Sequence, residues 1–105
     1  MRSLFDAFRR EVLALNPNIS EEYLKLYVAY KAETNFVDVV PQANALRLSL
    51  NMKWPELSDP RGICINVSGK GRWGNGDVEI KLTEPLDLPY VVGLVRQSLD
   101  LQLGE

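Results

Sequence analysis

The sequence has no histidine, a single cysteine and no long apolar run, and each shortage excludes a class of function. Without histidine the chain cannot form a Ser-His-Asp triad, a zinc site with histidine ligands or a histidine general base. Its one cysteine, Cys64, can neither close an internal disulfide nor supply a cysteine-rich metal site. Because no nucleophile–base pair or metal-binding set is visible, we expect no metal, no cofactor and no enzymatic activity.

Charge and apolar patterning exclude further classes and indicate a compartment. The chain has 12 Lys and Arg residues against 14 Asp and Glu, which argues against a protein that coats DNA by its overall charge. The densest late apolar run, Val91–Val95, is far shorter than the roughly 20 residues of a membrane span. Charged residues interrupt the apolar residues of positions 1–10, so this N-terminal segment lacks the apolar core of a signal peptide. The lone Cys64 suits a reducing compartment, and we expect a cytoplasmic protein with no membrane partner.

The 105 residues suit one domain, 1–105, with a helix near each end. The N-terminal helix is predicted to end at Asn16-Pro17. The C-terminal helix is predicted to begin at an Asp87 N-cap and to close at Gly104. The apolar residues that recur at helical spacing are Leu4, Phe8 and Val12 in the first helix and Leu88, Val91 and Val95 in the second.

The region between these helices is rich in strand patterns. Alternation predicts strands over Leu46–Met52 and Asp77–Leu82, and a tight turn at Glu33–Asn35 is predicted to lead into a strand over Phe36–Val40. Glu22–Lys31 fits either a strand or a helix, and we favour a strand because its neighbours need a partner. Trp54–Gly76 is predicted to be a long irregular connection. The fold class is therefore α+β, with a single antiparallel sheet of about four to five strands and the N- and C-terminal helices packed on one face.

A glycine-rich segment in this connection matches the dinucleotide-binding pattern G-x-G-x-x-G. That function requires a helix directly after the glycines to hold the pyrophosphate. The sequence continues instead into Asn-Gly, which favours a tight hairpin turn, and then into a strand. We interpret the segment as a structural loop, with contact to a ligand or nucleic acid as the alternative. The loop residues are Gly69, Gly71, Trp73, Gly74, Asn75, Gly76 and Asp77.

Positive charge gathers between Ala43 and Gly76, a stretch that contains five basic residues and only two acidic ones. Basic side chains interleaved with tryptophan are what a phosphate backbone and unstacked bases require. The alternative is ordinary surface charge, with the tryptophans as core lids. The predicted phosphate contacts are Arg47, Lys53, Arg61, Lys70 and Arg72, with Trp73 as a stacking platform.

Several stretches of the chain together resemble a known family. They are Leu26–Lys31, Asn35–Val37, Val40–Gln42, Leu46–Met52, Asp59–Gly62, Val67–Gly69, Gly71, Trp73–Asp77 and Tyr90–Ser98. They are similar to an uncharacterised prokaryotic domain family that is often labelled "predicted transport protein". Members often occur at the C-terminus of larger proteins, some of which resemble the GmrSD-type restriction endonucleases. The resemblance implies a small α+β accessory domain and no catalytic residue, and the transport label finds no support in the sequence.

Two functions follow as hypotheses. The first is a non-enzymatic accessory domain that contacts nucleic acid or positions a nuclease-type partner in a restriction or defence system. The second is a protein–protein interaction module, including a homodimer, with no nucleic-acid binding. The second predicts an exposed apolar patch near Tyr23, Tyr27 or Trp54.

Overall fold

The computed structural model describes residues 2–69 and 76–104. Two short 3-10 turns, η1 (Trp54–Glu56) and η2 (Pro85–Asp87), precede β5 and α2. Neither described helix has the length and apolar character needed to cross a membrane. The helices and strands are α1 (Arg2–Leu13), β1 (Ser20–Tyr23), β2 (Val28–Lys31), β3 (Asn35–Pro41), β4 (Leu46–Leu50), β5 (Ile65–Asn66), β6 (Val78–Leu82) and α2 (Leu88–Gln102).

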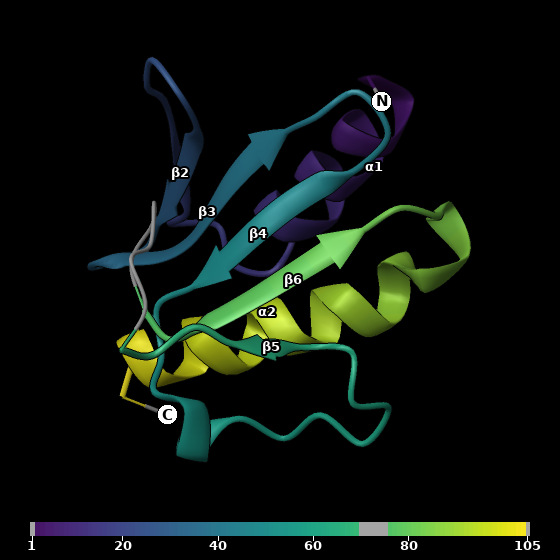
Figure 1. The fold of residues 1–105 in the computed structure, drawn as a ribbon. Coiled ribbons are helices and arrows are strands. Elements are labelled where there is room, and N and C mark those ends of the chain that lie inside the picture. The colour runs from purple at the N-terminus through teal and green to yellow at the C-terminus, as the bar shows by residue number, and fades with distance from the viewer. Residues whose placement is uncertain (1, 70–75, 105) are drawn as a thin grey trace.

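The six strands form one antiparallel sheet in the order β1-β2-β3-β4-β6-β5. Both helices lie behind the same face of this sheet (Figure 1). The α+β class predicted from the sequence is therefore confirmed, with six strands where about four to five were expected. We call the other side, which carries no helix among the described residues, the helix-free face.

The prediction of one strand over Glu22–Lys31 was wrong. β1 ends at Tyr23 and β2 begins at Val28, and these two residues lie opposite each other in an antiparallel hairpin. The Leu24 N–H donates to the Tyr27 carbonyl oxygen over 2.9 Å and closes the turn. Residues 24–27 contain no Gly, Pro, Asn or Asp, so the usual signals of a tight turn are missing from this part of the sequence.

The core lies between the sheet and the two helices. Alternate side chains of the central strands point into it, as the strict alternation of β4 and β6 predicts. The Phe8 ring of α1 packs edge-to-face on Tyr30, with 6.1 Å between ring centroids. Each large apolar side chain removed from water stabilises the fold by roughly 1.5–3 kcal/mol. The largest fully buried side chains include Tyr30, Phe8, Phe36, Leu46, Leu48, Leu50, Ile80 and Leu82.

A β-bulge in β3 redirects one side chain. Tyr30 lies opposite Val37, but the next residue, Lys31, lies opposite Asn35, so Phe36 is an extra residue in the ladder. Cross-strand partners point to the same side of a sheet, so Asn35 shares the helix-free face with Lys31. Without the bulge, strict alternation would place Asn35 on the other face.

The ends of α2 follow the sequence with one exception. Pro89 lies in the first turn, and Gly104 follows the helix with φ +77°. Asp87 occupies the N-cap position, but its side chain makes no capping hydrogen bond. The Asp87 carboxylate accepts instead from the Arg61 guanidinium, 3.1 Å away. The predicted N-cap position of Asp87 is confirmed, but its side chain binds Arg61, a residue distant in sequence, and does not cap the helix.

Candidate functional site

The six predicted nucleic-acid contacts fall into two groups. Lys70, Arg72 and Trp73 lie outside the described residues. Of the other three, two are paired with carboxylates: Arg47 Nη2 lies 3.0 Å from Glu79 Oε1, and Arg61 Nη2 lies 3.1 Å from Asp87 Oδ1. A carboxylate at that distance offsets the attraction of a guanidinium for phosphate.

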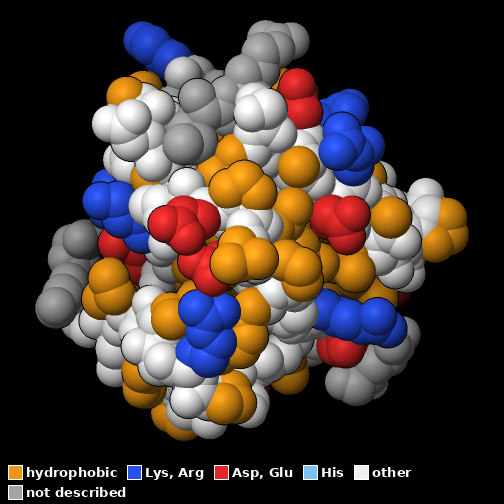
Figure 2. All heavy atoms as spheres, turned by 90° about the vertical axis from the view of Figure 1, so that its right-hand side faces the viewer, with side chains coloured by type: hydrophobic (Ala, Val, Ile, Leu, Met, Phe, Trp, Pro, Cys, Tyr) orange, Lys and Arg blue, Asp and Glu red, His pale blue; other side chains and the backbone are white. Residues whose placement is uncertain are grey.

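The surface that Figure 2 shows has no continuous field of positive charge among the described residues. On this face, basic side chains lie beside acidic ones, with apolar side chains between them. Interspersed charges of both signs largely cancel at a distance, so this face would attract a polyanion weakly.

Lys53 has different surroundings. It is exposed, and no carboxylate of the described residues pairs with it. The carbonyl oxygen of its neighbour Met52 accepts from the Asp77 N–H over 3.0 Å, and the Asp77 carbonyl accepts from the Val67 N–H over 2.8 Å. The two ends of the segment that contains the predicted loop therefore meet next to Lys53.

Three residues of the predicted structural loop lie within the described ranges, namely Gly69, Gly76 and Asp77. Gly71, Trp73, Gly74 and Asn75 lie outside them. Gly76 has φ +88°, and a Cβ atom there would lie 2.0 Å from the Leu50 carbonyl oxygen. Only glycine fits both this backbone conformation and this close approach.

The helix-free face contains a polar row that the sequence analysis did not single out. Asp38 of β3 lies opposite Ser49 of β4, which lies opposite Glu79 of β6. Asp38 is 0% exposed and Ser49 is 3% exposed. Asn35, which the bulge turns to this face, donates from Nδ2 to Asp38 Oδ1 over 2.7 Å. A buried carboxylate needs such donors because burial removes its hydration.

Charges flank this polar row in opposite pairs. Lys31 Nζ lies 2.7 Å from Glu22 Oε1, and Arg47 pairs with Glu79. The hydrogen bond and charge of Glu22 raise the pKa of Lys31, and Asp38 adds to the effect. No group of three or more acidic, cysteine or histidine residues among those described is placed to hold a metal ion. The row therefore combines a buried carboxylate that accepts from the Asn35 amide with two ion pairs beside it.

A second polar cluster fixes the segment after η1 to the start of α2. The Tyr90 hydroxyl donates to Asp59 Oδ1, and the Cys64 N–H donates to Asp59 Oδ2 over 2.8 Å. The Arg61 guanidinium lies over the Tyr90 ring, 4.7 Å from its centroid. These contacts, together with the Arg61–Asp87 ion pair, hold residues 59–64 against the helix.

The pKa values of this cluster do not favour a reactive thiolate. Burial is the main cause that raises the pKa of Cys64 to about 12, and the hydrogen bond and charge of the nearby Asp59 carboxylate contribute to this value. Partial burial would raise the pKa of Asp59, but the hydrogen bonds from Tyr90 and Cys64 bring it below its usual value. Cys64 is therefore a neutral thiol near pH 7, and a neutral thiol is a poor nucleophile.

The turn between β1 and β2 exposes apolar side chains to solvent. Tyr23 is 63% exposed, Leu24 40% and Leu26 75%. Lys25 lies among them, is exposed, and has no carboxylate partner within the described part of the chain. We call Tyr23, Leu24, Lys25 and Leu26 the hairpin surface.

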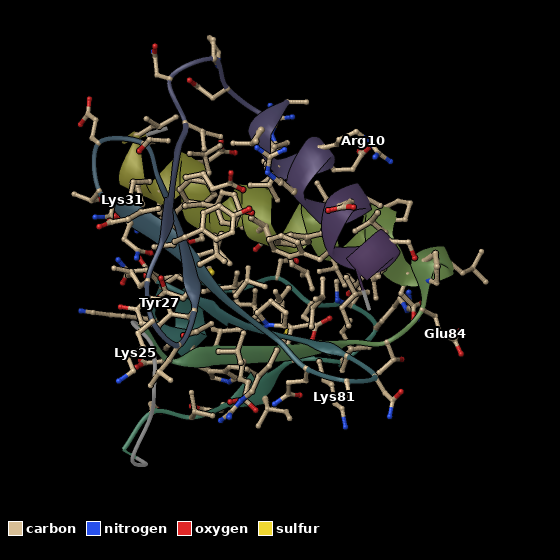
Figure 3. The ribbon with its side chains drawn as sticks, turned by 90° about the horizontal axis from the view of Figure 1, so that it is seen from above. Arg10, Lys25, Tyr27, Lys31, Lys81 and Glu84 are labelled. Carbon is tan, nitrogen blue, oxygen red and sulfur yellow. The ribbon has the colours of Figure 1, made fainter. Side chains whose placement is uncertain are left out.

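The hairpin surface is held in a defined shape. The hairpin projects at the upper left of Figure 1, and its turn is closed by the Leu24–Tyr27 backbone hydrogen bond. The Tyr23 ring packs edge-on against Phe5 of α1, with 6.5 Å between centroids. Figure 3 shows Lys25 and Tyr27 on the side of the hairpin turned away from α1. A preformed surface loses little conformational freedom when it binds.

Comparison with known families gives one match that spans nearly the whole chain. Residues 1–102 match a family described as a domain of unknown function (DUF5655). The chain belongs to this family. It is also similar to an uncharacterized protein of Haemophilus influenzae, with 35% identity over 99 residues. That match covers 94% of this chain and 33% of the relative, so the chain spans about a third of the relative's length. No solved structure gives a significant match.

These matches confirm the resemblance to an uncharacterised prokaryotic domain family. Asp38, a central residue of the polar row of this DUF5655 domain, was not among the site residues predicted from the sequence. One signal was available, because Asp38 interrupts an apolar strand between Val37 and Val39, where a charged residue needs buried partners. The bulge that supplies Asn35 as one of those partners had no comparable signal.

Proposed function

We propose that this DUF5655 domain is a non-enzymatic protein interaction module that binds its partner through the hairpin surface. The observation that carries the proposal is the exposure of Tyr23, Leu24 and Leu26 on one closed turn. Clustered apolar side chains left in water on a defined surface are typical of protein–protein contacts. The hypothesis of a protein–protein interaction module predicted an exposed apolar patch near Tyr23, Tyr27 or Trp54, and Tyr23 lies in the hairpin surface.

Two further observations support an accessory role. The Haemophilus relative is about three times as long as the matched region, so in that protein the domain is joined to other chain segments. The resemblance to C-terminal parts of GmrSD-type restriction proteins makes a nuclease-type protein the first class of external partner to test. We place the module in the cytoplasm, a location supported by the free thiol of Cys64.

Site-specific photo-crosslinking in cells tests this proposal. A photoreactive phenylalanine analogue at Leu26 should give discrete crosslinked products. The matched control is Leu86, which is 86% exposed and lies in η2, away from the hairpin. Products at position 26 that disappear when Leu24 is replaced by Asp support the proposal. Equal products at both positions, or none at position 26, contradict it.

Nucleic-acid contact is the second candidate, and Lys53 is the observation that favours it. Lys53 has no carboxylate partner among the described residues and lies where the two ends of the segment that contains Lys70 and Arg72 meet, so it could form part of a local phosphate site even on an acidic protein. Short fluorescent single- and double-stranded DNA should then bind more weakly as salt rises. Lys53→Glu should weaken binding, whereas Arg10→Glu, the same charge change on exposed α1 surface, should not. If both variants weakened binding equally, the binding would depend on the net charge of the protein and not on a site at Lys53.

A further inference from the structure

We infer that the hairpin surface binds a second copy of this chain, so that two domains form a symmetric dimer. This inference rests on the proposed function and specifies its partner. A two-fold dimer requires a surface complementary to itself, in which residue i of one copy meets residue j of the other and the reverse. The hairpin has the apolar and charged groups that such a surface needs.

The charges of the hairpin are complementary under a two-fold axis. Lys25 has no carboxylate partner among the described residues, and the Glu22 side chain is 48% exposed although it pairs with Lys31. Both lie within four positions of one turn. In a two-fold arrangement Lys25 of each copy meets Glu22 of the other. The apolar side chains between these charges then pack on their counterparts and leave water.

Direct pairing of two β1 strands is a different arrangement, and the charges of β1 oppose it. β1 is an edge strand of the sheet, but Glu21 points toward the helices, with Arg9 Nε at 2.8 Å and the Tyr30 hydroxyl at 2.7 Å. An inward-pointing charge is a common device that protects sheet edges. Antiparallel pairing of two copies centred on β1 would also place Glu21 of one copy opposite Glu22 of the other. The contact therefore uses the side chains of the turn.

The closed turn and the Tyr23–Phe5 contact keep the surface in its binding shape before association. A contact confined to one hairpin is small, and interfaces at the low end of the size range are weak and transient. We therefore expect a reversible dimer that appears as the concentration rises from micromolar toward millimolar.

Sedimentation equilibrium of the purified chain over this concentration range tests the inference. The wild-type chain should shift from the monomer mass of 11.9 kDa toward twice that value. Leu26→Asp should weaken dimerisation by about thirtyfold or more, because it places a charge in the apolar contact. Leu86→Asp is the matched control and should leave the dimer unchanged. A chain that stays monomeric throughout, or a dimer unaffected by Leu26→Asp, overturns the inference.

A charge exchange tests the Lys25–Glu22 contact itself. Lys25→Glu and Glu22→Lys should each weaken the dimer by about tenfold, and the double variant should recover to within about threefold of wild type. Failure of the double variant to recover, with unfolding curves like those of the wild type, contradicts the two-fold arrangement. The photo-crosslinks at Leu26 separate the two proposals. Products larger than a dimer would support the interaction module and exclude a second copy as its partner.

Discussion

The Ser98 hydroxyl of α2 donates a hydrogen bond of 2.7 Å to the carbonyl oxygen of Phe36, the extra residue of the β3 bulge. Ser98 is fully buried, and the same hydroxyl lies 3.3 Å from the Asn51 carbonyl oxygen. Gln102, one turn further along α2, donates to that carbonyl oxygen over 2.8 Å. The C-terminal half of α2 therefore fixes the place where β3 departs from regular pairing.

Replacement of Ser98 by Ala should lower the free energy of unfolding by about 1–2 kcal/mol. The variant removes a buried donor, while the Phe36 carbonyl oxygen keeps its bond from the Asn51 N–H. Urea unfolding followed by circular dichroism measures the change. Ser3→Ala on the exposed side of α1 is the control and should change stability by less than about 0.5 kcal/mol. If Ser98→Ala left the free energy of unfolding unchanged, the hydroxyl would not be what holds the bulge in place.

Two glycine substitutions should change stability in opposite directions. Gly93 is exposed within α2, and a Cβ atom there would meet nothing within 4 Å. Gly93→Ala should therefore stabilise the domain by about 0.5–1 kcal/mol, since alanine loses less backbone entropy in a helix. Gly76→Ala should destabilise it by more than about 2 kcal/mol, because of the positive φ and the contact with the Leu50 carbonyl oxygen. Thermal unfolding of both variants measures the two effects. Equal shifts of the unfolding midpoint would contradict the surroundings described for Gly93 and Gly76.

The polar cluster formed by Asp59, Tyr90 and the Cys64 N–H should protect the Cys64 thiol from alkylation. Iodoacetamide should modify the native thiol much more slowly at pH 8 than it modifies the urea-unfolded chain, because the raised pKa leaves little thiolate. Asp59→Asn removes a charge that opposes ionisation and loosens residues 59–64, so alkylation should accelerate by about tenfold. Mass spectrometry measures the rate. Glu84→Gln, an exposed carboxylate elsewhere, should have no effect, and a rate unchanged in Asp59→Asn would exclude the cluster as the cause of protection.

Stability should fall as the solution becomes alkaline. In the folded chain, burial together with the hydrogen bond and charge of Asp59 raises the pKa of Cys64 from its usual 9.0 to about 12. Burial, with a further effect of Glu21, raises the pKa of Tyr30 above its usual 10.0. Above pH 9 the unfolded chain loses these protons while the folded chain keeps them, so the stabilisation is complete below pH 9 and is lost as the pH rises. Urea midpoints from pH 8 to 11 measure the slope, which Cys64→Ala and Tyr30→Phe should each reduce.

The sequence predicted the elements whose side chains alternate regularly. β4 and β6 were assigned correctly because every second residue is apolar and meets the same core. The Leu24–Tyr27 turn was missed because its residues are those of a strand, and only the pairing of Tyr23 with Val28 reveals it. Local pattern determines strands well, whereas a turn without glycine, proline or asparagine depends on contacts made after folding.

The candidate site was harder to predict because its contacts join distant parts of the chain. Arg47 was expected to be available for phosphate, but β4 lies beside β6, and this pairing brings Glu79 to Arg47. Arg61 likewise meets Asp87, which the local sequence assigned to a helix cap. Charge counted along a stretch of sequence does not register carboxylates that the fold brings in from elsewhere.

The extra residue in β3 also determines which changes of length the β2–β3 connection can tolerate. Loss of Phe36 would let the ladder close without a bulge and would leave Asn35 opposite Lys31. A shift of the β2–β3 pairing by one residue would instead change parity and exchange inward and outward positions at the end of the strand. A change of two residues preserves that parity.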